Sequence, residues 1–457
     1  MDDAIVSWLI AAGVLVIGAV LLILLRSHAE RDILTSARSA ATTGSTQVVP
    51  GAEPDAAATL TAIEAVGNAM IDAGYSVMTV RNALHDIARI NGLPASEMVV
   101  FPTALLVSAR GEEEQRTGVI SSGERSMLLA QVDELQLAVD AARTGVLDPG
   151  STTDRIRQIR DMKPQYGPMP RVFGYALLSI GLAVLLGSSW IGVATAAALG
   201  ALVGAALLLS ERLPARYGAL ITVAIAFGVS LTVFLLIRAG FGSGILAALI
   251  AALVLFLPGS LLTTAVLELS TGQIVSGAGR LAAGAMQLVL LAAGIVTAAA
   301  LVGVPEFEFS EHSLTLGVIA PWIAVAVFGV GLALNQCALW RSLPWIVLVL
   351  YFAYSAQVIG DIFLGGVLSA FVGALVVTPV SAFVAKHPSG PAALVSFRPA
   401  FWLLVPGALG LVGVTDVLGG DASGLNTLVA TVGTMVAVAL GVLAGSVFSS
   451  RMERPAF

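Results

Sequence analysis

The chain has 457 residues, of which 57% are hydrophobic and only 11% are charged, and its mean hydropathy is +0.93. Soluble domains carry about 25% charged residues, so this composition excludes an ordinary soluble protein and predicts a helical polytopic membrane protein. One cysteine excludes an intrachain disulfide, and four scattered histidines without ligand spacing argue against a metal site. Nothing in the sequence points to a nucleic acid partner or a cofactor.

The first apolar run covers residues 4–25 and is long enough to cross a bilayer. An acidic leader, Asp2-Asp3, precedes it, and Arg26 and Arg31 follow it. This arrangement predicts a retained transmembrane helix (residues 1–32) with its N-terminus outside, and a cleaved signal peptide is the alternative. Residues 33–58 are small and polar and predict a flexible linker.

Residues 59–165 predict a small cytoplasmic α/β domain. Apolar residues recur at helical spacing before and after Gly74, which predicts a pair of amphipathic helices. Residues 97–109, interrupted by Pro102, and residues 115–120 predict short strands. A further helix is expected to start with a capping box at Ser121 and Glu124. The domain has no nucleophile motif, phosphate loop or metal-ligand spacing, so we expect a regulatory or gating role and not an enzyme.

Ten apolar segments of the remaining chain predict membrane spans. They cover residues 171–187, 190–210, 217–237, 243–265, 281–303, 314–335, 343–357, 360–384, 400–419 and 425–448. Basic residues gather in alternate loops (Arg212, Arg216, Arg280, Arg341, Lys386 and Arg398), whereas the opposite side offers only Arg238. This positive-inside pattern places residues 26–170 and the C-terminus in the cytoplasm.

Two of these spans are interrupted by the same residues at the same spacing. One offset of 148 residues maps Pro258, Gly259, Glu268 and Gly272 onto Pro406, Gly407, Asp416 and Gly420. The breaks fall in the fourth and ninth spans, which predicts two five-helix repeats, residues 171–303 and 314–448. Because five is odd, the second repeat must be inverted, as in many secondary transporters with paired broken helices.

The broken helices predict a site for a small polar solute. Opened backbone can coordinate the solute, and the hydroxyls of Ser260, Thr263 and Thr264 lie beside the first break. Membrane carboxylates are functional by default, so Glu268 and Asp416 are candidate proton carriers, with Asp361 a weaker one. The alternative is that these acids cap helix ends or reach the interface.

Arg280 is the main candidate cation near this site, which favours a zwitterion over a dicarboxylate. Small residues such as Gly200, Gly204, Gly277, Gly284 and Gly441 are expected to allow close helix packing. No Walker motif occurs, so ATP-driven transport has no support in the sequence.

The order of the motifs resembles the threonine/serine exporter family (ThrE type). The resemblance rests on "AMIDAGYSVMTVRNAL" and "FPTALLVSA" in the polar domain, then on "LPGSLLTTAVLELSTGQIVSGAGRL" and "LLVPGALGLVGV" in the membrane part. It implies a bacterial inner-membrane secondary exporter of small amino acids, driven by the proton motive force, with a cytoplasmic N-terminal domain and about ten membrane helices. The candidate site positions that it carries over are Pro258, Gly259, Glu268, Gly272 and Arg280.

The sequence thus favours an exporter of L-threonine and L-serine that works by antiport with protons. A dicarboxylate exporter of the same fold and a passive channel for small polar metabolites are the alternatives, because relatives of the family split over two chains are linked to dicarboxylates. The direction of transport follows from the resemblance alone. Assembly into a homo-oligomer is left open by the sequence.

Overall fold

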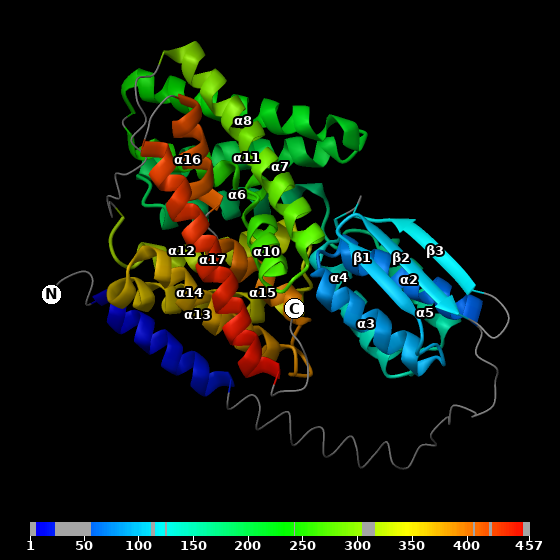
Figure 1. The fold of residues 1–457 in the computed structure, drawn as a ribbon. Helices are drawn as coiled ribbons and strands as arrows, with labels where there is room; N and C mark the ends of the chain where they lie inside the picture. Colours follow the sequence, from blue (N-terminus) through cyan, green and yellow to red (C-terminus); the bar gives the residue numbers. More distant parts are fainter. Residues whose placement is uncertain are drawn as a thin grey trace.

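The computed structural model describes residues 6–22, 56–110, 115–123, 126–241, 243–303, 316–404, 407–419 and 423–450. These residues form a large bundle of apolar helices and a smaller α/β unit that lies against the bundle (Figure 1).

The α/β unit, residues 56–161, contains four helices and a three-stranded antiparallel sheet in the order β1-β2-β3. Its elements are α2 (Ala56–Asp72), α3 (Val77–Ile90), β1 (Glu97–Phe101), β2 (Ala104–Arg110), β3 (Gln115–Ser121), α4 (Leu129–Arg143) and α5 (Pro149–Arg160). Pro102 lies in the tight turn that lets Phe101 pair with Ala104, so the predicted interruption of the strand region is confirmed. The buried side chains of Leu105 and Val107 point from β2 into a core that α2 helps to form.

The predicted start of the third helix at Ser121 is wrong. Ser121 pairs with Ala104 and ends β3, so its backbone belongs to the sheet. The helix α4 begins at Leu129, and the side chain of Gln131 accepts a hydrogen bond from the backbone N–H of Leu128 at 2.9 Å. Glu124 lies outside the described residues.

The apolar bundle consists of two sets of helices, which we define as α6–α11 and α12–α17. The first set contains α6 (Pro168–Leu185), α7 (Trp190–Ser210), α8 (Gly218–Leu236), α9 (Leu246–Ala252), α10 (Gly259–Ser270) and α11 (Ile274–Val302). The second contains α12 (Ala320–Asn335), α13 (Leu343–Leu364), α14 (Gly366–Val384), α15 (Ala393–Leu404), α16 (Gly407–Gly419) and α17 (Ser423–Ser450). Short helical turns connect some of them: η1 (Ala215–Tyr217), η2 (Ile237–Phe241), η3 (Ser243–Ile245), η4 (Val254–Phe256) and η5 (Trp340–Ser342).

Among the described residues, seven helices are long and apolar enough to cross a membrane, and two bent pairs raise the count to nine. The chain is therefore a multi-pass membrane protein. The predicted count of ten core spans is not reached in these residues, because α12 has 16 residues and spans about 24 Å, less than a hydrocarbon core of about 30 Å. The described part of the N-terminal apolar helix, Val6–Leu22, packs against α13, where Gly18 faces Phe352.

Glycines allow the helices of the bundle to approach one another closely. At the crossing of α6 and α12, a Cβ added at Gly174 would lie 2.7 Å from the backbone nitrogen of Asn335. A Cβ added at Gly331 would collide with the backbone nitrogen of Leu178. The sequence prediction of small residues at helix contacts is confirmed, because all five predicted glycines also face a neighbouring helix: Gly200, Gly204, Gly277, Gly284 and Gly441.

The contacts within the two sets correspond. In the first set α7 packs on α9, α8 on α11 and α10 on α11, and in the second set α13 packs on α15, α14 on α17 and α16 on α17. Across the sets, α10 contacts α17 and α11 contacts α16. Each broken helix is therefore placed between the last helix of its own set and the last helix of the other set.

Candidate functional site

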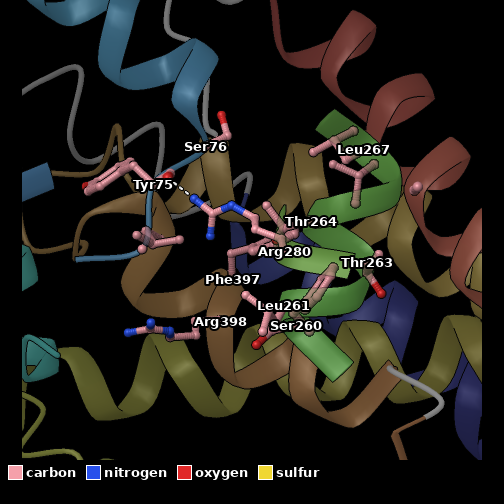
Figure 2. A pocket seen from close by; sticks show the side chains of 15 residues that line it. Tyr75, Ser76, Ser260, Leu261, Thr263, Thr264, Leu267, Arg280, Phe397 and Arg398 are labelled. Atoms are coloured by element: carbon pink, nitrogen blue, oxygen red, sulfur yellow. Dashed lines mark hydrogen bonds between the residues drawn. The ribbon is translucent and has the colours of Figure 1, made fainter. Parts of the chain in front are cut away.

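A cavity of about 170 Å³ lies where the α/β unit meets the broken helix of the first set (Figure 2). Cavities of about 150 Å³ hold ligands the size of benzene, so this one has room for a small metabolite. Polar lining comes from Ser76 of the α2–α3 loop, from the hydroxyls of α10, from Arg280 of α11 and from Arg398 of α15. The complete lining is Gly74, Tyr75, Ser76, Ser260, Leu261, Thr263, Thr264, Leu267, Arg280, Leu394, Phe397, Arg398, Phe401, Ala439 and Val442.

The helix that presents these hydroxyls starts at the proline break. Pro258 is the residue before α10, Gly259 is the first residue of the helix, and both are buried. The axis turns by 58° between α9 and the following segment, Val254–Ser270, because proline cannot continue the hydrogen-bond ladder. Protein side chains satisfy two of the freed carbonyls: the hydroxyl of Tyr175 donates to Ala252 at 3.0 Å, and Gln287 donates to Phe256 at 3.4 Å.

Glu268 forms a buried ion pair next to the cavity. One carboxylate oxygen lies 3.1 Å from Nε of Arg280, and the two side chains are 2% and 11% exposed. The turn between α10 and α11 makes this pairing possible, because Gly272 has φ +81° and the N–H of Gln273 donates to the carbonyl of Glu268 at 2.8 Å. The chain then reverses, and α11 returns Arg280 to Glu268. Gly272 therefore lies in the turn that follows α10 and does not line the cavity.

The same ion pair is hydrogen-bonded to the α/β unit. The second oxygen of Glu268 accepts a hydrogen bond at 3.2 Å from the N–H of Val77, the first residue of α3. Arg280 donates to the carbonyl of Tyr75 at 3.4 Å, as the dashed line in Figure 2 shows. The first N–H groups of a helix have no partner within the helix and favour a negative charge, so Glu268 supplies a cap for α3 across the interface.

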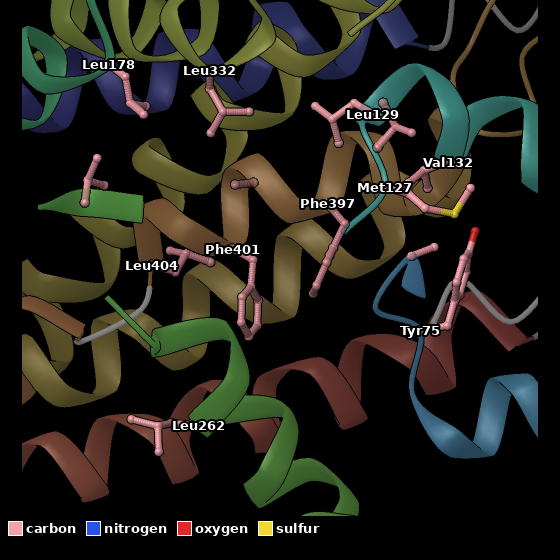
Figure 3. Close-up of a cluster of buried hydrophobic side chains, with 14 of the residues drawn as sticks. Tyr75, Met127, Leu129, Val132, Leu178, Leu262, Leu332, Phe397, Phe401 and Leu404 are labelled. Atoms are coloured by element: carbon pink, nitrogen blue, oxygen red, sulfur yellow. The ribbon is translucent and has the colours of Figure 1, made fainter. Parts of the chain in front are cut away.

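Buried contacts hold the α2–α3 loop in place. The hydroxyl of Tyr75 donates to the side chain of Gln136 on α4 at 2.6 Å. Burial, with the carboxylates of Asp140 and Asp133, raises the pKa of Tyr75 above its usual value, so the hydroxyl stays a neutral donor. Apolar side chains from both parts of the molecule surround this loop, with Met127 and Val132 beside Tyr75 and Phe397 facing them (Figure 3).

Helix α4 attaches the α/β unit to the second set. The N–H groups of Leu129 and Ala130 donate to the carbonyls of Gln336 at 2.9 Å and Cys337 at 3.2 Å. The carboxylate of Asp133 accepts from the N–H of Ala392 at 2.7 Å and from Arg341 at 3.2 Å. The α/β unit therefore contacts both sets of membrane helices.

The other acids of the sequence prediction lie elsewhere. Asp416 is near the end of α16, and its Cβ lies close to Gly424 at the start of α17. Asp361 is exposed near the end of α13. Neither residue lines the cavity. Gly407 is the first residue of α16, whereas Pro406 and Gly420 lie outside the described residues.

No group of three or more His, Cys, Asp or Glu residues in the described part of the chain could hold a metal ion. The cavity lining itself contains no acidic side chain. The chemistry that this site offers is the binding of a small polar molecule by hydroxyls and guanidinium groups.

The second arginine of the cavity and the α2–α3 loop are absent from the site residues that the sequence predicts. Arg398 was assigned to a cytoplasmic loop, but it lies within α15 and lines the cavity. No local signal in the sequence marks Arg398 as a cavity residue, because a basic residue before a proline and an apolar run is also typical of a loop. Gly74 was identified only as a break between two helices, although a Cβ at this residue (φ +85°) would lie 2.9 Å from the guanidinium of Arg398.

Comparison with known families gives a match over half of the chain. Residues 61–302 match the family described as "Putative threonine/serine exporter" (ThrE), which covers just over half of the chain. The chain belongs to this family. The matched region contains nearly all of the α/β unit and ends at the last residue of α11, so it includes the cavity residues of the first set. Comparisons with curated proteins and with solved structures found no match.

Proposed function

We propose that this member of the threonine/serine exporter family is a secondary exporter of small amino acids, threonine and serine, across the cytoplasmic membrane, in exchange for protons. The observation that carries the proposal is the buried Glu268–Arg280 pair, which borders the cavity and is hydrogen-bonded to the α2–α3 loop. An acid that holds a loop closed beside a solute cavity can couple its own protonation to the opening of that loop.

Protonation of Glu268 removes the negative charge that two partners share. Arg280 then loses its ion pair, and the N–H of Val77 loses a charged acceptor at the start of α3. Hydrogen bonds to charged groups contribute about 1.5–3 kcal/mol each, so neutralisation weakens the attachment of the loop substantially. The loop can then leave the cavity, and release of the proton restores the closed arrangement.

The proposed cycle uses the two five-helix sets as inverted repeats. The proposal is supported by the correspondence of helix contacts between the two sets and by the broken helix in the fourth position of each. In transporters of this kind, one repeat moves against the other around a fixed site. Asp416 would be the counterpart of Glu268 in the second repeat and remains a predicted coupling residue.

The orientation in the membrane follows from the distribution of basic residues. The α/β unit and the C-terminus would lie in the cytoplasm and the N-terminus outside. The cavity then opens toward the cytoplasmic face when the α2–α3 loop withdraws. A threonine or serine molecule would enter from that side.

The test is efflux of threonine from cells preloaded with a threonine dipeptide. We would compare wild type, Glu268→Gln and Asp416→Asn at equal membrane expression, with and without a protonophore. Wild type should export threonine in a protonophore-sensitive way, and Glu268→Gln should abolish this component. Glu211→Gln is the matched control, because Glu211 also pairs with an arginine, Arg171 at 2.6 Å, but is 56% exposed.

Three outcomes would contradict parts of the proposal. Wild-type cells that export no more threonine than empty-vector controls would refute the threonine assignment, and succinate would be tested next. Efflux that is indifferent to the protonophore and to Glu268→Gln would indicate a passive channel. Equal effects of Glu268→Gln and Glu211→Gln on protonophore-sensitive efflux would show that the buried Glu268–Arg280 pair has no special role in proton coupling.

A further inference from the structure

The guanidinium of Arg398 lines the cavity without a protein partner in the described residues. No hydrogen bond or ion pair joins it to any of them, and the cavity lining supplies no acidic side chain. The other arginine of the cavity, Arg280, is paired with Glu268 and bonded to Tyr75. Of the two arginines that line the cavity, Arg280 is therefore paired with a carboxylate of the described residues and Arg398 is not.

A partly buried guanidinium without a paired acid in the described part of the chain favours an anionic ligand in this place. Its neighbours on α15 are the apolar side chains of Leu394, Phe397 and Phe401, and Gly74 covers it from the α/β unit. Removing a charge from water without a partner is costly, so buried charges in proteins are paired. Guanidinium binds a carboxylate through two parallel hydrogen bonds, which makes a carboxylate the best-matched ligand.

The hydroxyls of α10 provide a second unoccupied set of polar groups. The hydroxyl of Thr263 is buried without a hydrogen-bond partner, and those of Ser260 and Thr264 line the cavity. Threonines in other membrane helices donate to the carbonyl four residues earlier, as Thr297 does at 2.7 Å and Thr378 at 2.9 Å. The hydroxyls of Thr263 and Thr264 make no such bond, and that of Thr264 remains available to a ligand in the cavity.

We propose that Arg398 binds the α-carboxylate of the transported amino acid, while the hydroxyls of α10 receive its ammonium and polar side chain. This inference rests on the proposed function and names the side chains that would hold its substrate. Arg398 belongs to the second set and the hydroxyls to the first, so a bound substrate bridges both sets of helices. Small side chains are selected because the cavity has a volume of about 170 Å³.

Competition binding tests the assignment. Purified protein in detergent would be incubated with radiolabelled threonine and competed with unlabelled threonine, threoninamide and succinate. Threoninamide keeps the hydroxyl and the amine but lacks the carboxylate. Wild type should prefer threonine over threoninamide at least tenfold, because a charge-assisted bidentate contact is lost in the amide.

Arg398→Gln should weaken threonine binding at least tenfold and remove the preference for threonine over threoninamide. Arg398→Lys keeps the positive charge, so it should retain part of the affinity and part of the preference. Arg238→Gln is the control, because Arg238 is exposed and, among the described residues, bonds a backbone carbonyl alone, that of Val302. The ratio of the two ligands is informative even where a variant is less stable, since loss of folding weakens both equally.

A threonine preference that survives in Arg398→Gln would overturn the proposal. Binding of succinate but not of threonine that depends on Arg398 would support a carboxylate site at Arg398 and refute threonine as the substrate. The same experiment can therefore support the carboxylate site at Arg398 while it refutes the proposed export of threonine.

Discussion

Asp133→Asn tests how the α/β unit is attached to the membrane helices. The carboxylate of Asp133 is 4% exposed and accepts hydrogen bonds from the N–H of Ala392 and from Arg341. An asparagine keeps the size of the side chain but has one acceptor oxygen, and its amide nitrogen would face a donor. The substitution therefore weakens the interface without creating a cavity.

The expected loss can be worked out from the two contacts. The hydrogen bond from Ala392 to a charged acceptor contributes about 1.5–3 kcal/mol. Arg341 is 55% exposed, so its pair with Asp133 contributes only about 0–1 kcal/mol. The total of about 1.5–4 kcal/mol corresponds to a roughly 10- to 1,000-fold increase in the population of the undocked state.

Hydrogen exchange followed by mass spectrometry measures this change. The N–H groups of Leu129 and Ala130 donate across the interface, so peptides that cover residues 126–143 should exchange faster in Asp133→Asn. Asp154→Asn is the matched control, because Asp154 forms an ion pair with Arg157 in which both side chains are 68% exposed. If both variants exchanged at the same rate, the reasoning would be refuted. Faster exchange throughout α2 would mean unfolding of the α/β unit and would also refute it.

Three further predictions concern stability, each measured by thermal melting in detergent. Glu268→Gln should lower the free energy of unfolding by about 3–5 kcal/mol, because it leaves Arg280 charged and unpaired. Adding Arg280→Gln should recover most of this loss, and additive losses would contradict the pairing. Gly331→Ala should lower the free energy of unfolding by about 1–3 kcal/mol, because the new methyl group meets the backbone of α6. Gly279→Ala should not destabilise, because a Cβ added at Gly279 has no neighbouring atom within 4 Å. Equal melting temperatures of the two variants would contradict this packing. Ser151 donates two hydrogen bonds to Asp148, the N-cap of α5, and lowers the pKa of this carboxyl group. The cap therefore stabilises the folded state fully above the unfolded pKa of about 3.9, and its contribution disappears as the pH falls through the lower folded pKa. Asp148→Ala should therefore cost about 1 kcal/mol near neutral pH and much less once the pH falls below the folded pKa of Asp148, and a pH-independent difference would contradict the capping role.

The membrane helices were predictable because their signals are local. Helices α6 and α7 begin and end within a few residues of the predicted spans, since runs of apolar residues and their flanking turns decide these limits. The break before α10 was predictable for the same reason, because proline cannot donate the hydrogen bond of a helix interior.

The partners of Glu268 were only partly predictable. Arg280 lies 12 residues away, so its proximity follows from one turn of the chain. Val77 lies 191 residues away, and its contact with Glu268 depends on the packing of the whole α/β unit. No periodicity or spacing in the sequence contains that information.

Arg398 was misassigned because two local rules pointed the same way. A basic residue before an apolar run favours a cytoplasmic loop, and a proline next to it disfavours a helix. In the structure α15 begins at Ala393, seven residues before the predicted span, and includes Pro399. Packing decides the outcome here, because Val395, Ser396 and Phe397 are buried. Membrane helices tolerate proline where neighbouring groups satisfy the freed backbone.

The attachments of the α/β unit to the two sets of membrane helices differ in kind. Its contacts with the second set include backbone hydrogen bonds from α4 and the buried carboxylate of Asp133. Its hydrogen bonds with the first set near the cavity involve the Glu268–Arg280 pair, so they depend on one carboxylate. A change in the charge of Glu268 therefore weakens one attachment and leaves the other intact. Under the proposed cycle, the α/β unit would stay with the second set while the first set separates from the α2–α3 loop, which gives the expected gating role a physical form.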